Sequence, residues 1–417
     1  MYLVVTENIH LILLATLAVL IYVYFKRAHS FWRRMGVPQL NPTFPFGDVA
    51  SVVLRRQNMA EKVKEVYDRM KGQKCVGMYF FSRPTFLPLD PVLIKDIQST
   101  DFEHFYDRGI YYDEENDPIS AHLFSIAGPK WKRLRAKMTP AFSPGKLKYM
   151  FDTIAQCGHQ MIDLLKQLTS EERGAVEIKE ILARYTTDVI GCCAFGLECN
   201  CMRNPQAEFR MMGKRAFTQT IGDLLKMIVI RSFPSLARLL RIGVFSRTVT
   251  NFFYRVVKET IEYREKNNVT RNDFLQLLIQ LRKDGQLDDN QNSENAKVPG
   301  VTGLTMEEAA AQAFIFFLAG FETTSTTISF ALFEMATNED IQLKARKEVV
   351  KVFKTFGGLS YESVMEMHYL DTIIFDSKKV PSSSSVSEEM HKDLPDTRHY
   401  QFHQRRIISD HTLLWAP

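Results

Sequence analysis

One acidic residue followed by five hydroxyl residues lies inside a strongly apolar stretch of this 417-residue chain. The stretch reads FIFFLAGFETTSTTISFALF, and Glu322 is followed by the hydroxyl side chains of residues 323–327. A buried carboxylate is costly unless it is paired or used. A carboxylate beside hydroxyl groups can relay protons to a bound water or ligand. These residues are therefore the first candidates for chemistry.

Helical spacing places several small and polar residues of this stretch on one face. The positions that share the face are Phe316, Gly320, Thr323, Thr324 and Thr327. Gly320 lacks a side chain, so a flat ligand could approach the backbone there. The Thr323 hydroxyl can bond the carbonyl of Ala319 and loosen the helix. Two interpretations stay open: a site at which Glu322 and Thr323 deliver protons, or a Thr-rich face packed on another helix with Glu322 at the surface.

A second pair of residues could bind an anion. In the segment WKRLR, Trp131 and Arg135 are four residues apart and share a helical face. An indole N–H and a guanidinium in this arrangement can clamp a carboxylate of a buried ligand. The alternative is a stacked pair on a surface helix.

The cysteines and histidines do not predict a metal site. The six cysteines are Cys75, Cys157, Cys192, Cys193, Cys199 and Cys201. Their spacing does not match a zinc site, so we interpret them as small buried hydrophobes in a reducing compartment. His399 and His403 are four residues apart, but no acidic ligand or helix signal accompanies them.

The N-terminus carries a membrane signal. Residues 11–25 read LILLATLAVLIYVYF, without a charge, and Lys26, Arg27, Arg33 and Arg34 follow. The length fits a bilayer span, and the positive flank predicts an uncleaved anchor with the rest of the chain in the cytosol. The alternative is a cleaved secretory signal. The net charge of +5 fits a membrane surface or an acidic protein partner, and we predict no nucleic-acid binding.

The remaining elements are mostly helical. Three prolines within 38–45 predict an extended linker, residues 59–71 a helix, and residues 75–90 a hairpin turning at 82–84. An aromatic loop spans 101–127, and amphipathic helices cover about 144–280. Within these, 224–245 is either a helix pair on a membrane surface or an ordinary connection.

Two further helices complete the pattern. Thr305 and Glu308 form a capping box that predicts the start of the long helix containing Glu322. A helix over 339–356 then ends at Gly357 and Gly358.

Together, these segments resemble the cytochrome P450 superfamily of haem-thiolate monooxygenases, of the insect microsomal type that metabolises foreign compounds. The blocks that carry the likeness are DFEHFYDRG, DPISAHLFSIAGPKWKRLRAKMTPAFSPGKLK, DVIGCCAFGLECN and AGFETT. The resemblance implies a mainly α fold with a small β-sheet, preceded by one transmembrane helix. It implies that Trp131 and Arg135 bind a haem propionate. It also implies that Ala319 and Gly320 line the oxygen pocket, where Glu322 and Thr323 assist O–O cleavage.

The resemblance also implies substrate and partners. Insertion of one oxygen atom from O₂ is expected into apolar small molecules, such as xenobiotics or steroid- and terpenoid-like compounds. Substrate contacts are expected from Phe105, Phe124, Phe316 and Thr327. The implied partners are the cytosolic face of the endoplasmic reticulum membrane, an NADPH-dependent flavoprotein reductase and a small haem electron donor.

The likeness ends near Phe375. The expected domains are an anchor over 1–26, a Pro-rich hinge over 27–50, a partial monooxygenase domain over 51–375 and a divergent, poorly ordered tail over 376–417. The family's axial Cys should lie near the C-terminus, but no Cys follows Cys201, and 376–379 reads DSKK in place of Glu-x-x-Arg. We therefore expect the chain as written to be inactive.

The alternative is a non-catalytic, membrane-anchored remnant or isoform that binds a reductase or membrane surface. A frameshift, a retained intron, a genuine truncated isoform or a decaying gene would each produce such a tail.

Overall fold

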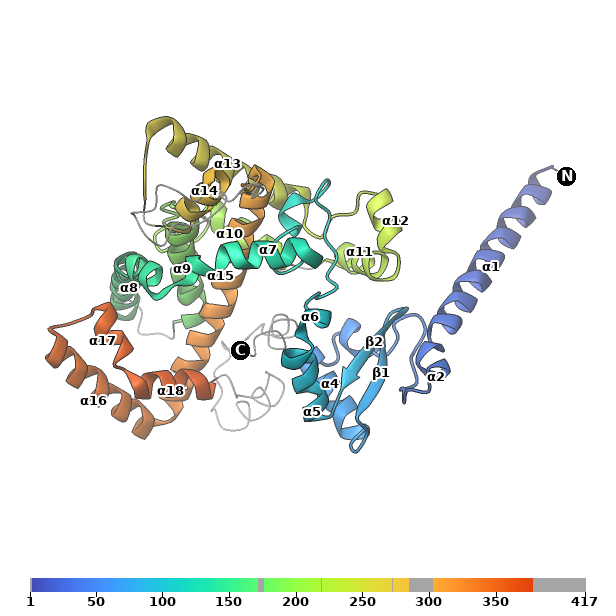
Figure 1. Cartoon of the computed structure of the whole chain (residues 1–417), viewed down its shortest axis with the longest axis horizontal. Helices are drawn as coiled ribbons and strands as arrows, with labels where there is room; N and C mark the ends of the chain where they lie inside the picture. The colour runs from blue at the N-terminus through green and yellow to red at the C-terminus, as the bar shows by residue number, and fades with distance from the viewer. Residues whose placement is uncertain (1, 172–175, 219, 272, 285–302, 378–417) are drawn as a thin grey trace. The chain divides into compact units, whose positions relative to one another are not determined.

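The computed structural model describes residues 2–171, 176–218, 220–271, 273–284 and 303–377. The predicted tail over 378–417 lies outside these residues. The described part is mainly helical with one two-stranded sheet, which confirms the predicted fold class (Figure 1). It divides into unit 1, with residues 2–106 and 223–240, and unit 2, with the described parts of 107–222 and 241–377. The domain boundaries given above stay a prediction.

Unit 1 contains the predicted hairpin. Strands β1 (Cys75–Phe80) and β2 (Arg83–Pro88) pair antiparallel, with Cys75 opposite Pro88 and Phe80 opposite Arg83. Val76 and Met78 of β1 pack with Val66 of helix α4 in a small apolar core. The helical elements of unit 1 are α1 (Tyr2–Ala28), α2 (Phe31–Arg34), α3 (Ala50–Val53), α4 (Met59–Arg69), α5 (Pro91–Lys95), η1 (Asp96–Thr100), α6 (Phe102–Phe105), α11 (Ile221–Ser232) and α12 (Pro234–Leu239).

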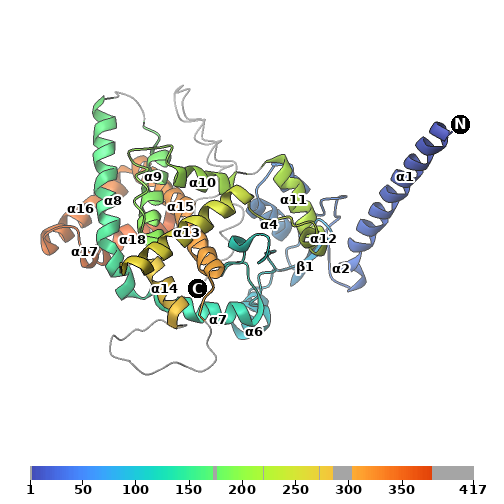
Figure 2. The same cartoon turned by 90° about the horizontal axis from the view of Figure 1, so that it is seen from above.

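Helix α1 is long and apolar enough to cross a membrane, as its sequence predicted. Figure 2 shows it as a single rod that leads into α2 and the hairpin. The C-terminal end of α1 contacts the folded part of unit 1, since the rings of Phe25 and Phe44 lie 5.3 Å apart. In the following helix α2, Trp32 Nε1 donates to the Met78 carbonyl of β1 at 3.1 Å. The anchor is therefore joined to the folded part of unit 1 by specific contacts.

Unit 2 is built around helix α15 (Met306–Thr337), which α9 and α13 flank (Figures 1 and 2). The predicted capping box is confirmed, since Thr305 Oγ1 accepts from the Glu308 N–H at 3.1 Å and Glu308 Oε2 accepts from the Thr305 N–H at 3.1 Å. Helix α15 also passes the length and composition test for a membrane span, but 33% of its apolar window is buried, compared with 6% for α1.

The other elements of unit 2 follow the predicted helical pattern. They are η2 (Pro118–Ser120), α7 (Gly128–Met138), η3 (Thr139–Phe142), α8 (Pro144–Glu171), α9 (Ile178–Ile190), η4 (Gly191–Phe195), α10 (Glu208–Phe217), α13 (Arg247–Asn267), α14 (Phe274–Asp284), α16 (Glu339–Phe356), α17 (Tyr361–Met365) and α18 (His368–Ser377). Gly357 ends α16 with a left-handed φ of 76°, which confirms the predicted stop.

Candidate active site

Helix α7 carries the predicted anion clamp. Trp131 is buried, and Arg135 is exposed one turn further along the helix. A third residue joins them from the aromatic loop: the Arg108 guanidinium lies 5.9 Å from the Trp131 ring centroid and 5.0 Å from that of Phe124. Sequence reasoning missed Arg108, because its place in a long loop indicated a functional segment without singling out a residue.

The charges at this clamp are unbalanced. Burial, and then the positive charge of Arg135, lower the pKa of the Arg108 guanidinium. Among the residues that the structure describes, neither Arg108 nor Arg135 has an ion pair with a carboxylate. Two neighbouring guanidinium groups and an indole fit a ligand with carboxylate groups, such as the propionates of a haem.

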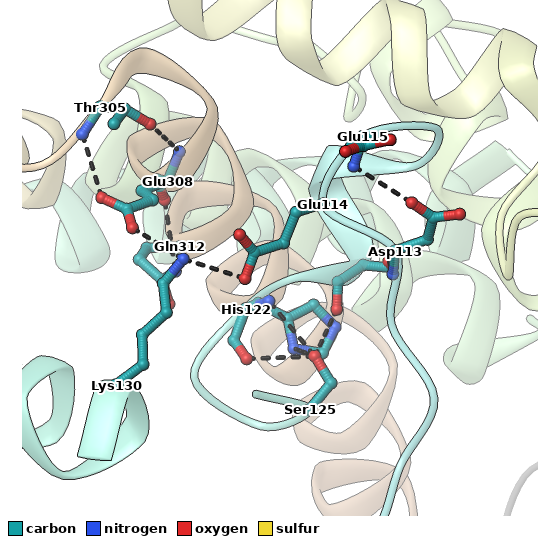
Figure 3. Close-up of polar contacts among 10 residues, drawn as sticks. Asp113, Glu114, Glu115, His122, Ser125, Lys130, Thr305, Glu308 and Gln312 are labelled. Atoms are coloured by element: carbon teal, nitrogen blue, oxygen red, sulfur yellow. Dashed lines mark hydrogen bonds and ion pairs between the residues drawn. The ribbon is translucent and has the colours of Figure 1, made fainter. Parts of the chain in front are cut away.

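The loop that supplies Arg108 is fixed to both α7 and α15. Lys130 Nζ lies 3.0 Å from a carboxylate oxygen of Glu114 and 3.0 Å from one of Glu308 (Figure 3). Burial acts to lower the pKa of Lys130, but the two carboxylates outweigh it and the pKa is raised. The Leu123 N–H donates to Gln312 Oε1 of α15 at 2.9 Å. The loop position is therefore set by contacts to two helices.

A buried histidine lies in the same loop. The Ser125 Oγ is 3.2 Å from His122 Nδ1 and accepts from the His122 N–H at 3.2 Å (Figure 3). Burial lowers the pKa of His122 to about 4, so the imidazole is neutral at physiological pH.

The hydroxyl face of α15 follows the predicted pattern in part. Thr323 Oγ1 donates to the Ala319 carbonyl at 2.5 Å, as predicted, and Thr327 Oγ1 donates to the Thr323 carbonyl at 2.9 Å. Ala319 and Thr324 are exposed, and Thr323 is half-buried. The expected loosening is not seen, because α15 is a continuous α-helix. One hydroxyl bonded back to the helix is not enough to open a turn here.

Gly320 contacts α9 closely. A Cβ at Gly320 would lie 2.4 Å from Ile190 Cδ1, so the glycine allows the two helices to pack. The Thr186 hydroxyl of α9 also donates to the Phe321 carbonyl at 2.8 Å. Helix packing alone therefore accounts for the glycine, and its role in the oxygen pocket stays a prediction.

Glu322 is buried at 7% exposure and pairs with Lys179 of α9, with 2.8 Å between Oε1 and Nζ. The interpretation that placed Glu322 at the surface is therefore wrong, although the helix contact that it assumed is present. No sequence signal marked Lys179 as the partner, because its α9 position lies 143 residues earlier in the chain.

The residues expected to contact substrate lie in different surroundings. Phe316 stacks on Phe274 of α14, with 3.8 Å between ring centroids, and lies 5.0 Å from the ring of Phe142. Phe124 contacts Arg108, and Thr327 is half-buried. Phe105 is exposed on α6 and belongs to unit 1. Their contact with substrate stays a prediction.

The thiols lie on elements other than α7 and α15. All six cysteines are free, in β1, α8, η4 and the segment 199–201. Cys157, Cys193 and Cys201 are buried, as predicted, whereas the other three are half-buried. Neither α7 nor α15 carries a thiol, and the roles of their residues toward a haem stay predictions.

Comparison with known proteins identifies the family. The family model for cytochrome P450 matches residues 38–375. Cytochrome P450 6a9 of Drosophila melanogaster is 41% identical over 378 residues, which are 89% of this chain and 73% of that protein. Cytochrome P450 6A1 of Musca domestica is 38% identical over 363 residues, which are 86% of this chain and 69% of that protein.

The chain belongs to the cytochrome P450 family, whose members are haem-thiolate monooxygenases. The two relatives named above are insect cytochromes P450 of group 6. By family, the chain is therefore an oxidoreductase of the insect P450 6 kind.

Proposed function

We propose that the fold serves a microsomal monooxygenase that inserts one oxygen atom from O₂ into apolar small molecules. The unbalanced pair of Arg108 and Arg135 beside Trp131 carries the proposal, because it needs an anionic ligand. When bound, haem would supply the dioxygen chemistry, and these three residues would hold its propionates. The apolar helix α1 supports attachment to the cytosolic face of the endoplasmic reticulum membrane, where a flavoprotein reductase or a small haem protein would supply electrons.

Glu322 and Thr323 are proposed to handle protons. The Glu322 carboxylate is paired with Lys179, at the α9 side of α15. Thr323 lies next to it in the chain, and its hydroxyl is bonded to the Ala319 carbonyl. The Glu322 carboxylate would have to leave Lys179 before it could exchange a proton with a ligand on the exposed side of α15. Lys179 therefore holds the carboxylate in place and opposes its release.

We further propose that the 417 residues by themselves do not turn over substrate. No Cys follows Cys201 in this sequence, and a thiolate ligand is what favours O–O cleavage in this family. This observation also supports the second candidate, a membrane-anchored protein without catalysis that binds a reductase or membrane surface.

Haem stoichiometry and the reduced carbon-monoxide spectrum test these proposals on the full chain in detergent. We expect haem uptake that falls at least tenfold in the double variant Trp131→Ala/Arg135→Ala. It should be unchanged in Arg133→Ala, which alters an exposed cation on the same helix. Equal uptake by all three proteins would contradict the clamp. A strongly red-shifted carbon-monoxide band, or turnover, would contradict inactivity.

Sequencing the messenger RNA across codons 365–417 and beyond separates the two candidate functions. A reading that restores a Glu-x-x-Arg helix and a downstream Cys loop would support the monooxygenase. A message that ends as written would support the non-catalytic protein.

A further inference from the structure

Helix α16 lies at the periphery of unit 2, beside α17 and α18 (Figures 1 and 2). One of its faces is buried: Ala345 packs with Ala331 of α15 and Ile373 of α18. On the same side, the Glu348 carboxylate accepts hydrogen bonds from the N–H groups of Tyr369 and Leu370 at 2.8 and 3.0 Å. This face is therefore committed to the core of the unit.

The opposite face of α16 forms a shallow groove of unusual composition. Its main lining residues are Leu343, Arg346, Lys347, Val350, Lys351 and Lys354. The two apolar residues, seven positions apart, are 48% and 47% exposed, and no acidic residue lines the groove. The groove thus combines four cations with two exposed aliphatic side chains.

The four cations have no counter-charge in the described part of the chain. None of them forms an ion pair with a carboxylate, whereas Lys344, outside the groove, lies 4.2 Å from the Tyr369 ring centroid. Like charges three and four residues apart on a helix destabilise it. The helix dipole favours Lys354 in the last turn, but it does not account for Arg346, Lys347 and Lys351 further back along the helix. The fold therefore gives no reason for this charge pattern.

We propose that this groove is the docking surface for an acidic segment of a partner protein. Carboxylates of the partner would pair with the four cations, and its apolar side chains would cover Leu343 and Val350. A second copy of this chain fits poorly, since it would bring four more cations. A lipid surface fits poorly too, since helices that lie on membranes need a wide apolar face. The inference rests on α16 alone and holds whether or not haem binds.

The test uses a fluorescein-labelled acidic amphipathic helical peptide, with Glu and Leu on one face, and the full chain in detergent. Fluorescence anisotropy should show binding to the unaltered chain. Binding should weaken roughly tenfold or more in the triple variant Lys347→Glu/Lys351→Glu/Lys354→Glu, because each lost pair becomes a like-charge contact.

The matched control is the triple variant Arg203→Glu/Arg247→Glu/Lys266→Glu. It makes the same change in net charge at exposed cations of unit 2 outside the groove. The Leu343→Ser/Val350→Ser variant should also bind more weakly, by about threefold to tenfold. Circular dichroism confirms that each variant is folded.

Four outcomes would overturn the proposal. Equal weakening in both charge-reversed proteins would show non-specific attraction. Sedimentation that reveals self-association, lost only in the groove variant, would assign the groove to a second copy. Peptide binding that begins only after deletion of residues 378–417 would assign it to this chain's own C-terminal segment. Binding to phosphatidylserine vesicles with the same dependence on the groove, without peptide binding, would assign it to lipid and equally reject the partner protein.

Discussion

The two halves of α15 are built differently. In the N-terminal half, side chains on every side of the helix are fully buried: Ala309, Ala310, Ala311, Gln312, Ala313, Phe314 and Phe317. In the C-terminal half, burial is sparser: Glu322, Ser325 and Ser329 share one face, whereas Ala331 lies on the opposite side and packs with Ala345 and Ile373. Spacing of three to four residues marks a single face of a helix.

This difference separates two tasks along one helix. The first half is surrounded by unit 2 and works as its core. The second half is only partly buried, and the exposed residues Ala319 and Thr324 lie near the point where the two halves meet. The hydroxyls of Thr323, Thr327 and Ser329 are tolerated there because each donates to the carbonyl four residues back. The comparison predicts that substitutions in the first half act on stability, and those on the open face act weakly.

The largest effect is expected in the core half. Phe317 is fully buried, and its ring centroid lies 5.1 Å from those of Phe209 and Phe253. Phe317→Ala should lower the free energy of unfolding by about 3–5 kcal/mol, because it removes ring contacts and leaves a cavity. Leu332→Ala, at a side chain that is 37% exposed, is the control and should cost less than about 1.5 kcal/mol. Urea unfolding in detergent measures both free energies. Similar losses of stability in the two variants would contradict the difference between the two halves of α15.

A pH effect of nearly the same size is expected from the loop against the core half. The pKa of His122 is lowered from 6.5 to about 4 by burial, so the unfolded chain binds its proton first as pH falls. The free energy of unfolding should therefore decrease as pH falls from 6.5 to 4, by about 3 kcal/mol in total. Below pH 4, His122 is protonated in both states, so it should cause no further loss. The measurement is urea unfolding at several pH values for the unaltered chain and His122→Gln. The same slope in both would reject this role of His122.

A smaller effect is expected where the halves meet. Gly320→Ala should destabilise by about 1–3 kcal/mol, since the new methyl group would collide with the end of the Ile190 side chain. Ile190→Val in the same protein should recover part of the loss. Gly158→Ala on α8, where nothing lies within 4 Å of the new atom, should be neutral or stabilise by up to about 1 kcal/mol. Thermal unfolding of the three proteins measures these changes in stability. If Gly320→Ala left the stability unchanged, α9 and α15 would not be closely packed at this point.

The smallest effects are expected on the open face. Thr324→Ala should change stability by no more than about 0.5 kcal/mol, because the side chain is exposed. Thr323→Val removes one hydrogen bond to the Ala319 carbonyl and should cost about 0.5–1 kcal/mol. A loss above about 2 kcal/mol in either protein, measured by urea unfolding, would show that this face is part of the core after all.

The sequence was informative where the signal is local. The capping box at Thr305, the hairpin and the glycine that ends α16 are short-range patterns, and all three were confirmed, although the hairpin turns at residues 81–82 and not at 82–84. The Thr323 hydrogen bond is equally local, since its acceptor is one turn away. Such features depend on backbone geometry within a few residues.

What the sequence did not reveal depends on distant partners. Lys179 pairs with Glu322, and Ile190 fills the space over Gly320, but neither has a distinctive local pattern. Hydropathy also scores α15 as a candidate membrane span, because the composition of a core helix and a membrane helix is alike. Only the three-dimensional arrangement shows which apolar helix is covered by protein.

The hydrogen bond between Leu123 and Gln312 has a consequence for synthesis of the chain. The two residues are 189 positions apart, so the ribosome must translate that length before the contact can form. At typical rates this takes about 10–40 s. During that interval Trp131 and Phe124 emerge without the helix that later fixes their loop, while α1 has already left the ribosome. A nascent chain in this state would be a natural client for chaperones at the membrane surface.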